Sequence, residues 1–371
     1  MQQARTYVMA SEIICYLLPI GLMILLANTN GVSCSRVMVD RSDDEKSPSS
    51  SMRRRAQYEQ WRRLHGKSYR DASEEEERYH IFRQNVDRIE AFNNANKQQR
   101  GGYQLGLNKF ADLTNHEFRA RHAGGYNPKV SLSATVAPPP NHFKYENVTE
   151  VPEALDWRAQ GAVTPVKEQL QCGCCWAFSA VAAVEGLNKI KTGELVSLSE
   201  QELLDCNGDG MSCDGGIMEN AFNFIVNNNG LAAESIYPYT ALQSASCGGN
   251  GHAGSVRISG YESVPAEDEI ALLKAVANQP VSVGINGGTD GFQFYSGGIF
   301  DDMDCGPTLN HAVTVVGYGS DEEAGASYWI VKNSWGSGWG EGGYMRITRD
   351  TNYAQNPGMC GLAMDGSYPT L

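Results

Sequence analysis

Hydrophobic and polar residues follow different spacings in successive parts of the chain. An apolar run, Ile13–Ala27, lies near the N-terminus, and the polar stretch 34–57 that follows it has no apolar period. Helical spacing begins near Ala56 and becomes regular over Ala72–Asn96, where the residues of one helix face recur every three or four positions. The pattern predicts a disordered segment, 34–57, followed by two helices.

The spacing changes again in the second half of the chain. Helices are predicted over Trp176–Leu187, ending near Gly193, and over Leu198–Leu204, after which the chain is rich in loops as far as about Gly260. Beyond that point apolar and polar residues alternate, which predicts strands, interrupted by one helix at about Glu267–Asn278. The predicted strands are Val281–Ile285, Ala312–Val316, Tyr328–Val331 and Tyr344–Ile347. This order of elements favours the α+β class.

The N-terminal apolar run has the features of a secretory signal. Arg5 precedes it, small polar residues follow it, and Pro19 interrupts it. Its 15 residues are short for a membrane span, which needs about 20. An uncleaved membrane anchor is the alternative interpretation. We expect 1–33 to be a signal peptide, so that the chain enters the secretory pathway and meets the membrane only in transit.

Length, cysteine content and charge narrow the class of protein. With 371 residues, 41% of them hydrophobic, the chain can form two or three units with real cores. Ten cysteines favour an oxidising compartment. The net charge of −13 is uneven, because 151–371 carries 9 Lys and Arg against 26 Asp and Glu. An acidic part preceded by a basic one argues against nucleic acid as a partner and fits an intramolecular complex.

Candidate chemistry centres on Gln169–Ser179, where Cys175 directly precedes the Ala-rich helix predicted from Trp176. Free N–H groups and the dipole at a helix N-terminus favour an anion, so a thiolate is accessible there. A buried structural cysteine or a disulfide half is the ordinary alternative. Zinc would need a second Cys or His pair, which the downstream sequence lacks, and we expect neither a metal nor a cofactor.

A nucleophilic thiolate needs a proton partner that later acts as a general acid. Residues 151–371 contain two histidines. His252 lies in a Gly-rich segment that is poorly suited to orient a catalytic ring, whereas His311 begins an apolar strand. The sequence therefore favours His311 over His252 as the partner of Cys175.

Three motifs resemble those of papain-like cysteine proteases of the plant papain and cathepsin L type. The first is Cys172-Gly-Cys-Cys-Trp176, which departs from the family pattern at Cys174, where Ser or Ala is usual. The second is the interspersed ERFNIN motif of the propeptides, here Glu74, Arg78, Phe82, Asn85, Ile89 and Asn93. Taken alone, this stripe would be ordinary amphipathic packing. The third, over 106–112, matches the GxNxFxD motif of the same propeptides. The resemblance to the family spans roughly 58–370.

The resemblance implies a fold and a domain organisation. We expect a papain-like α+β peptidase domain over 151–371, with a helical left domain, a β-barrel-like right domain and a cleft between them. A helical inhibitory propeptide is expected at 58–118, and a linker that contains the maturation site at 119–150. The later part of the propeptide would lie along the cleft and block it.

The resemblance also implies roles for individual residues. Cys175 would be the nucleophile, His311 its acid–base partner and Asn333 the residue that orients the imidazole. Gln169 and the Cys175 N–H would form the oxyanion hole. The substrate-binding positions by motif are Gly215, Gly216, Ile217, Met218, Gly284, Leu309, Asn310, Ala312, Trp335 and Asp365. Our further hypothesis is that Asp365 admits Arg or Lys into a pocket that otherwise prefers bulky apolar side chains.

Six cysteines of the peptidase part can pair in 15 ways, and the sequence alone does not choose among them. By motif position the resemblance implies the disulfides Cys172–Cys213, Cys206–Cys247 and Cys305–Cys360. Cys174 would remain a free thiol. Asn147, in Asn-Val-Thr, is the predicted glycosylation site.

We therefore expect a monomeric cysteine endopeptidase, made as a zymogen, that degrades proteins through an acyl-thioester in a vacuole, a lysosome or the extracellular space. Expected partners are protein and peptide substrates, the protein's own propeptide and cystatin-type inhibitors. Three alternatives are a catalytically inactive storage or binding relative, a free-standing protease inhibitor and an exopeptidase of the same fold. Acid activation is a further hypothesis, because histidines and carboxylates in or facing the pro-region would become protonated.

Overall fold

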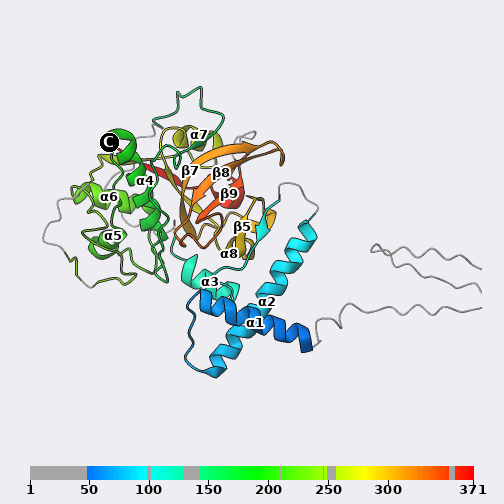
Figure 1. Cartoon of the computed structure of the whole chain (residues 1–371). Helices are drawn as coiled ribbons and strands as arrows, with labels where there is room; N and C mark the ends of the chain where they lie inside the picture. Colours follow the sequence, from blue (N-terminus) through cyan, green and yellow to red (C-terminus); the bar gives the residue numbers. More distant parts are fainter. Residues whose placement is uncertain are drawn as a thin grey trace, which may run out of the picture. The chain divides into compact units, whose positions relative to one another are not determined.

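The structure, a computed structural model, describes most of the chain from Pro48 onward (Figure 1). The described residues are 48–97, 102–126, 128, 143–208, 210–244, 246–248, 256–350 and 356–371. The expected signal peptide, 1–33, and the segment around His252 lie outside them. Met52–Leu371 forms one unit, and the description below concerns that unit. In this described part of the chain, no helix combines the length and the apolar character required to cross a bilayer.

The pro-region contains α1 (Pro48–Leu64), α2 (Ala72–Asn96) and α3 (Asn115–His122). The bounds of α2 confirm the prediction from its periodicity. Helix α3 was not predicted, although Thr114 and Glu117 form a capping box at its start, which is a local signal for a helix N-terminus. Short helices of this kind are easily missed when only hydrophobic spacing is considered.

Helix α1 begins well before the position near Ala56 that hydrophobic spacing had suggested, so the prediction of disorder is wrong for 48–57. Its first turns are held by charge: Arg54 donates hydrogen bonds to Asp87 (2.8 Å) and Glu90 (2.8 Å) on α2. Because ion pairs have no apolar period, the pattern of hydrophobic residues could not reveal this part of the helix.

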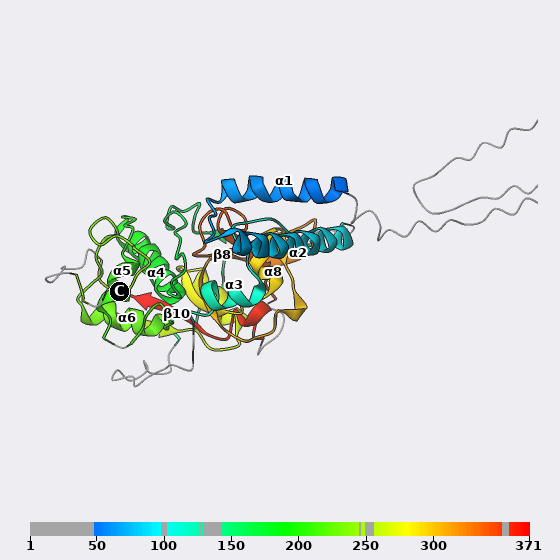
Figure 2. The ribbon, with the colours of Figure 1, turned by 90° about the horizontal axis from the view of Figure 1, so that it is seen from below.

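The stripe along α2 is not ordinary amphipathic packing, because its asparagines bind the backbone of the segment that follows. The Asn85 amide donates to the carbonyls of Ala111 (2.9 Å) and Leu113 (3.0 Å). Asn93 exchanges two hydrogen bonds with the backbone of Leu105. Phe82 packs in an aromatic cluster with residues of α1. In Figure 2, α1 lies on the outer side of α2, away from the sheet.

The first half of the peptidase part is helical. Helix α4 (Cys175–Thr192) ends at Gly193, as predicted, and Gly193 adopts the left-handed conformation. Helix α5 (Glu200–Cys206) corresponds to the helix expected at Leu198–Leu204. Helix α6 (Met218–Asn227), however, lies in the stretch that was predicted to be loops. Its buried residues are Met218, Ala221, Phe222 and Ile225, a helical spacing that was present in the sequence.

The second half carries an eight-stranded sheet of order β3-β10-β4-β7-β8-β9-β6, with β2 paired to β7. Neighbouring strands are antiparallel except β6 and β9. The strands are β2 (Leu155–Asp156), β3 (Gly260–Ser263), β4 (Val281–Ile285), β6 (Ile299–Phe300), β7 (His311–Asp321), β8 (Ala326–Lys332), β9 (Tyr344–Thr348) and β10 (Gly366–Thr370). The four predicted strands are present as β4, β7, β8 and β9, and the α+β class is confirmed.

Shorter elements complete the second half. Helix α7 (Glu269–Val276) is the one predicted helix there, and α8 (Asp290–Phe294) was not predicted. Strand β5 (Tyr295–Gly297) pairs antiparallel with β1 (Gln104–Leu105) of the pro-region. A strand of the pro-region is therefore hydrogen-bonded to the peptidase part. Met303–Cys305 and Met359–Gly361 form 3₁₀ turns.

The two halves of the peptidase part meet at α4 and the sheet. Ser179 of α4 donates to the Val313 carbonyl (2.6 Å), and its own carbonyl accepts from Ser282 (2.9 Å) and Thr314 (3.2 Å). These bonds tie the helix that begins at Cys175 to the strand that begins at His311. The disulfides are the implied pairs, Cys172–Cys213, Cys206–Cys247 and Cys305–Cys360.

Candidate active site

Cys175 is the first residue of α4 and is fully buried in the precursor. The loop before the helix is pinned by the Cys172–Cys213 disulfide and by the hydrogen bond from Gly173 N to the Cys213 carbonyl (2.8 Å). The backbone N–H groups of Ala312 and Trp176 favour the thiolate form of Cys175. The sulfur is therefore placed at a helix N-terminus beside the first residues of β7, as the sequence predicted.

His311 and Asn333 lie together because their strands are neighbours. His311 starts β7, Asn333 directly follows β8, and the two strands pair antiparallel. The His311 Nε2 atom lies 2.9 Å from Asn333 Oδ1. Since a carbonyl oxygen only accepts, Nε2 carries the hydrogen and Nδ1 is left with its lone pair. Within the described chain Nδ1 is buried and has no hydrogen-bond partner. Trp335 stacks on the ring at 4.6 Å.

Burial sets the protonation of both groups in the precursor. It raises the pKa of the Cys175 thiol to about 12, against the backbone donors that lower it. It lowers the pKa of His311 to about 4, although the hydrogen bond to Asn333 acts in the opposite direction. While the site is covered, burial therefore disfavours both the thiolate of Cys175 and the imidazolium of His311.

Gln169 is fully buried and its side chain is held on both sides. Its Nε2 atom donates to the Cys172 carbonyl (3.0 Å), and its Oε1 atom accepts from the Ser334 hydroxyl (2.6 Å). Its backbone N–H donates to the Ser334 carbonyl (2.8 Å). These three hydrogen bonds fix the Gln169 amide, to which the resemblance assigned the role of oxyanion donor. Sequence reasoning missed Ser334, which stands beside Asn333 and has no distinguishing motif.

The pro-segment residue Gly125 contacts the backbone of the predicted substrate-binding glycines. The Gly216 N–H donates to the Gly125 carbonyl (3.1 Å), and Gly215 lies against the same residue. A side chain on Gly125 would collide with the Gly173 carbonyl, because its Cβ would lie 2.1 Å from that oxygen. Only glycine allows this approach. Tyr126 and Gly216 form a parallel bridge, which defines the direction of the pro-segment in the site.

Tyr126 fills the predicted side-chain pocket and is almost fully buried. It belongs to the same apolar cluster as Ile217, Met218, Leu309 and Ala312. A Cβ on Gly284 would lie 2.6 Å from the Tyr126 ring, so the absence of a side chain there makes room for it. At the end of the pocket the Tyr126 hydroxyl donates to the Asp365 carboxylate. At its mouth the Tyr126 N–H donates to the Asn310 carbonyl (3.2 Å).

Of the predicted substrate-binding residues, Gly216, Gly284, Asn310 and Asp365 contact Tyr126, and four more share its apolar cluster. Gly215 lies against Gly125, and Trp335 stacks on His311. Tyr126 itself was not predicted, since no spacing rule assigns a single aromatic residue of the pro-region to a pocket that is distant in sequence. Burial raises the pKa of Asp365, and the hydrogen bond from Tyr126 opposes that effect. The pKa of Glu219, which is half-buried, is also raised by desolvation and by the nearby Asp365.

Aromatic residues of the pro-region cover Trp335. The rings of Phe110 (5.7 Å) and Phe118 (5.2 Å) meet it edge to face. His122 lies among them, 4.7 Å from Phe110, and its Nδ1 donates to the Leu170 carbonyl (3.0 Å). These contacts exclude water from the His311–Asn333 pair.

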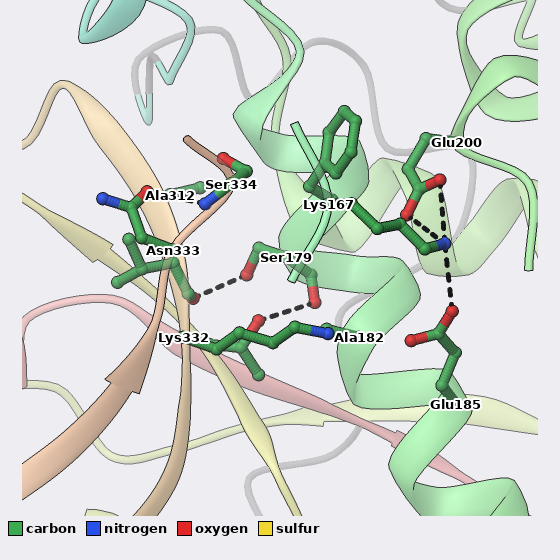
Figure 3. A pocket seen from close by; sticks show the side chains of 12 residues that line it. Lys167, Ser179, Ala182, Glu185, Glu200, Ala312, Lys332, Asn333 and Ser334 are labelled. Carbon is green, nitrogen blue, oxygen red and sulfur yellow. Dashed lines mark hydrogen bonds and ion pairs between the residues drawn. The ribbon is translucent and has the colours of Figure 1, made fainter. Parts of the chain in front are cut away.

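Charged and polar residues line a cavity behind Asn333 (Figure 3). Lys167 bridges Glu185 (3.1 Å) and Glu200 (2.8 Å). Lys332 donates to Thr164 (2.9 Å) on the same side. Because these charges neutralise one another, the cavity is best explained as the polar junction between the two halves. No cluster of three or more potential metal ligands is found among the described residues.

The sequence and structure match known families over most of their length. The family model for papain family cysteine proteases matches 151–370, and the model for the cathepsin propeptide inhibitor domain (I29) matches 58–118. The senescence-specific cysteine protease SAG12 of Arabidopsis thaliana is 50% identical over 316 residues, covering 84% of this chain and 89% of that protein. The senescence-specific cysteine protease SAG39 of Oryza sativa subsp. indica is 47% identical over 342 residues, covering 91% and 95%.

Two solved precursors share the fold. The proform of the Amb a 11 cysteine protease, a ragweed pollen allergen, has a TM-score of 0.78 and 41% identity, covering 90% of this chain and 98% of that one. A recombinant stem bromelain precursor has a TM-score of 0.76 and 44% identity, covering 86% and 99%. The chain therefore belongs to the papain family of cysteine proteases, and it is a cysteine endopeptidase made with an N-terminal inhibitory propeptide.

Proposed function

We propose that Cys175, His311 and Asn333 hydrolyse peptide bonds in general protein degradation once the propeptide has left. The observation that carries this proposal is the position of Gly125–Tyr126, which occupies the predicted substrate site above an assembled His311–Asn333 pair. A storage or binding relative has no need of a complete site that is covered by its own chain. The arrangement is that of a zymogen.

The reaction follows from the free Nδ1 atom of His311. This nitrogen takes the proton of the Cys175 thiol, and the thiolate attacks the carbonyl carbon of the scissile peptide. A C–S bond forms while the negative charge moves to the carbonyl oxygen. The imidazolium then gives its proton to the amine as the C–N bond breaks, which leaves an acyl-thioester. Water, deprotonated by His311, hydrolyses the thioester and restores the thiol.

The oxyanion would be bound by the Cys175 N–H and by Gln169. The Gln169 amide has two hydrogens and uses one for the Cys172 carbonyl, so the second is available to the substrate. Removal of one such donor costs about 3–4 kcal/mol of transition-state stabilisation in other acyl-transfer enzymes.

Departure of the propeptide would change the charge state of the site. While the site is covered, burial disfavours both the thiolate and the imidazolium. Water that returns to the open cleft relieves that penalty, and each charge then stabilises the other. We therefore propose that the thiolate–imidazolium pair forms in the mature enzyme, after the propeptide has left the cleft.

For the substrate, we propose a bulky apolar or basic residue at the second position before the scissile bond. Apolar residues line the Tyr126 pocket, and the Asp365 carboxylate at its end accepts a hydrogen bond from a side chain. A guanidinium or ammonium group could replace the Tyr126 hydroxyl there. The test is Asp365→Ala assayed on matched Phe-Arg and Arg-Arg reporters. A relative loss on Arg-Arg supports the proposal, and an unchanged ratio contradicts it.

For its cellular context, we propose a monomeric enzyme of the secretory pathway, acting in a vacuole, a lysosome or the extracellular space. Three disulfides fit an oxidising compartment, and one relative is named a KDEL-tailed cysteine endopeptidase of Arabidopsis thaliana. Asn147 is exposed, as a glycosylation site requires. Cystatin-type inhibitors are proposed as partners of the opened cleft.

The decisive experiment measures turnover of a fluorogenic Phe-Arg peptide by the purified precursor before and after incubation at pH 4.5 with reductant. We expect activity to appear as about 150 N-terminal residues are lost, on the order of 10⁴-fold above a Cys175→Ala control. The epoxide inhibitor E-64 should abolish it. A protein that loses its pro-region cleanly and stays inactive on a panel of peptides would overturn the proposal.

A further inference from the structure

Tyr239 connects the oxyanion side of the site to the residue beside the nucleophile. Its hydroxyl lies 2.8 Å from the Gln169 carbonyl oxygen and 3.0 Å from Cys174 Sγ. The ring packs edge to face on Phe178 of α4, with 5.0 Å between the ring centres. One hydroxyl group therefore contacts both the loop that carries Gln169 and the first turn of α4.

The direction of these hydrogen bonds is fixed by chemistry. A carbonyl oxygen can only accept, so the Tyr239 O–H donates to Gln169. The hydroxyl oxygen is then free to accept from the Cys174 S–H. Cys174 is fully buried, and burial raises the pKa of its thiol, which keeps the sulfur protonated and able to donate. The three groups form a chain that runs from Cys174 through Tyr239 to Gln169.

The loop that carries Gln169 needs such support. Leu170, the next residue, has a positive φ of 55° and is half-exposed, which is a strained conformation for a leucine. The Gln169 side chain is held by Ser334 and Cys172, but its carbonyl group is held mainly by Tyr239, with a longer bond from Cys172 N (3.3 Å). Rotation of this peptide group would move the amide donor.

We propose that Tyr239 and Cys174 are positioning residues that fix the Gln169 peptide and thereby aim its amide at the oxyanion. This inference rests on the proposed function of Gln169. It also gives Cys174 a role that a serine could fill at this position but an alanine could not, because S–H and O–H can both donate to the Tyr239 oxygen. Neither residue touches the substrate; both act through Gln169.

Tyr239→Phe removes the hydroxyl and keeps the ring on Phe178. We expect kcat to fall about 5–20-fold with little change in KM. A misplaced Gln169 donor should lose only part of the transition-state stabilisation that deletion of the donor would remove. The inhibition constant of a peptide aldehyde, whose thiol adduct carries an oxyanion, should rise by a similar factor. The rate of inactivation by E-64 should stay the same, because opening of an epoxide places no charge on a carbonyl oxygen. Tyr237→Phe is the matched control: that hydroxyl contacts Asp205 and Gly248 instead.

The role of Cys174 is tested in the same assays. Cys174→Ser retains a donor and should stay within about twofold of the parent, whereas Cys174→Ala should lower kcat about 2–5-fold. In a Gln169→Ala background, Tyr239→Phe should cause no further loss, because its effect passes through Gln169. Active-site titration with E-64 corrects every rate for the folded fraction.

Three results would overturn the inference: an unchanged kcat in Tyr239→Phe, an equal loss of E-64 reactivity, or an additive loss with Gln169→Ala. If Tyr239→Phe does not fold, equal kcat values for Cys174→Ala and the parent would overturn it instead. Each of these outcomes presupposes an active parent enzyme. An inactive parent would contradict the proposed function itself, so the two failures are distinguishable.

Discussion

The pro-region and the peptidase part are each stabilised internally, but by different kinds of interaction. In the described pro-region, charge pairs join α1 to α2, one aromatic cluster lies between these helices, and no disulfide is present. The peptidase part has two large apolar cores, a sheet and three disulfides. Exposed charge pairs contribute about 0–1 kcal/mol each, whereas a disulfide contributes about 2–4 kcal/mol.

The difference suggests how one chain can combine a durable enzyme with a removable inhibitor. Charge pairs weaken when carboxylates are protonated, but disulfides and apolar cores do not depend on pH. The two parts meet at Trp335 through Phe110 and Phe118, with an ion pair between Lys109 and Glu168 at the rim. Acid should therefore loosen the pro-region while the peptidase part stays folded.

The largest expected effect comes from one truncation made in each part. Phe118→Ala removes a fully buried ring from the contact with Trp335. Phe222→Ala removes a fully buried ring from the apolar core formed by α4, α5 and α6. Each should cost about 3–5 kcal/mol. We expect Phe118→Ala to mature at pH 7 with an unchanged melting temperature of the mature enzyme. Phe222→Ala should lower that temperature by on the order of 10 °C.

Both outcomes are measured by gel-based maturation assays and differential scanning calorimetry of the mature form. A Phe118→Ala precursor that stays latent at pH 7 would show that the aromatic contact does not hold the inhibitor. A lowered melting temperature of its mature enzyme would show that the two parts are not independent.

A smaller effect concerns His122, whose burial, together with the nearby Lys109 cation, lowers its pKa to about 4. The folded pKa lies below the ordinary value, so the released pro-region binds more protons below about pH 6.5. Docking free energy is consequently lost as the pH falls from about 6.5 to about 4, by about 3 kcal/mol in total. His122→Gln keeps a donor for the Leu170 carbonyl but does not titrate.

We expect the pH midpoint of maturation to move to more acidic values in His122→Gln, while His80→Gln, at an exposed position on α2, behaves as the parent. The midpoint is read from precursor and product bands between pH 4 and pH 7.5. Identical profiles for His122→Gln and the parent would assign acid sensitivity to the carboxylates instead, and equal rates at pH 5 and pH 7.5 in the parent would rule out acid activation.

The smallest effect is expected at the outer surface of the pro-region. Arg54 pairs with Asp87 and Glu90, and the hydrogen bond from Arg54 lowers the pKa of Glu90 against the effect of burial. Arg54→Ala should destabilise the precursor by less than about 1 kcal/mol, and added salt should reduce the difference. Urea unfolding of precursors in the Cys175→Ala background measures it. A loss of several kcal/mol would show that α1 depends on this pair.

Much of the fold was predictable because its signals are local. The periodicity of Ala72–Asn96 predicted the bounds of α2, and the alternation of apolar and polar residues predicted β4, β7, β8 and β9. Helix α6 was missed although Met218, Ala221, Phe222 and Ile225 carry a helical spacing, because the whole stretch was predicted to be rich in loops. The first turns of α1 were missed for a different reason: they are held by ion pairs to α2, which leave no periodic trace.

The sequence by itself determined the kinds of residues available for chemistry and the elements that carry them: a cysteine at a helix start, a histidine at a strand start, and an asparagine at a strand end. It could do so because capping and hydrophobic spacing act over a few residues. Only the tertiary structure decided which groups meet. The pairing of β7 with β8 brings His311 to Asn333, the pro-segment that bridges Gly216 places Tyr126 on Asp365, and the Tyr239 hydroxyl reaches Gln169. Such contacts join residues far apart in the chain, and they exist only after the cores and the sheet have fixed the backbone in space.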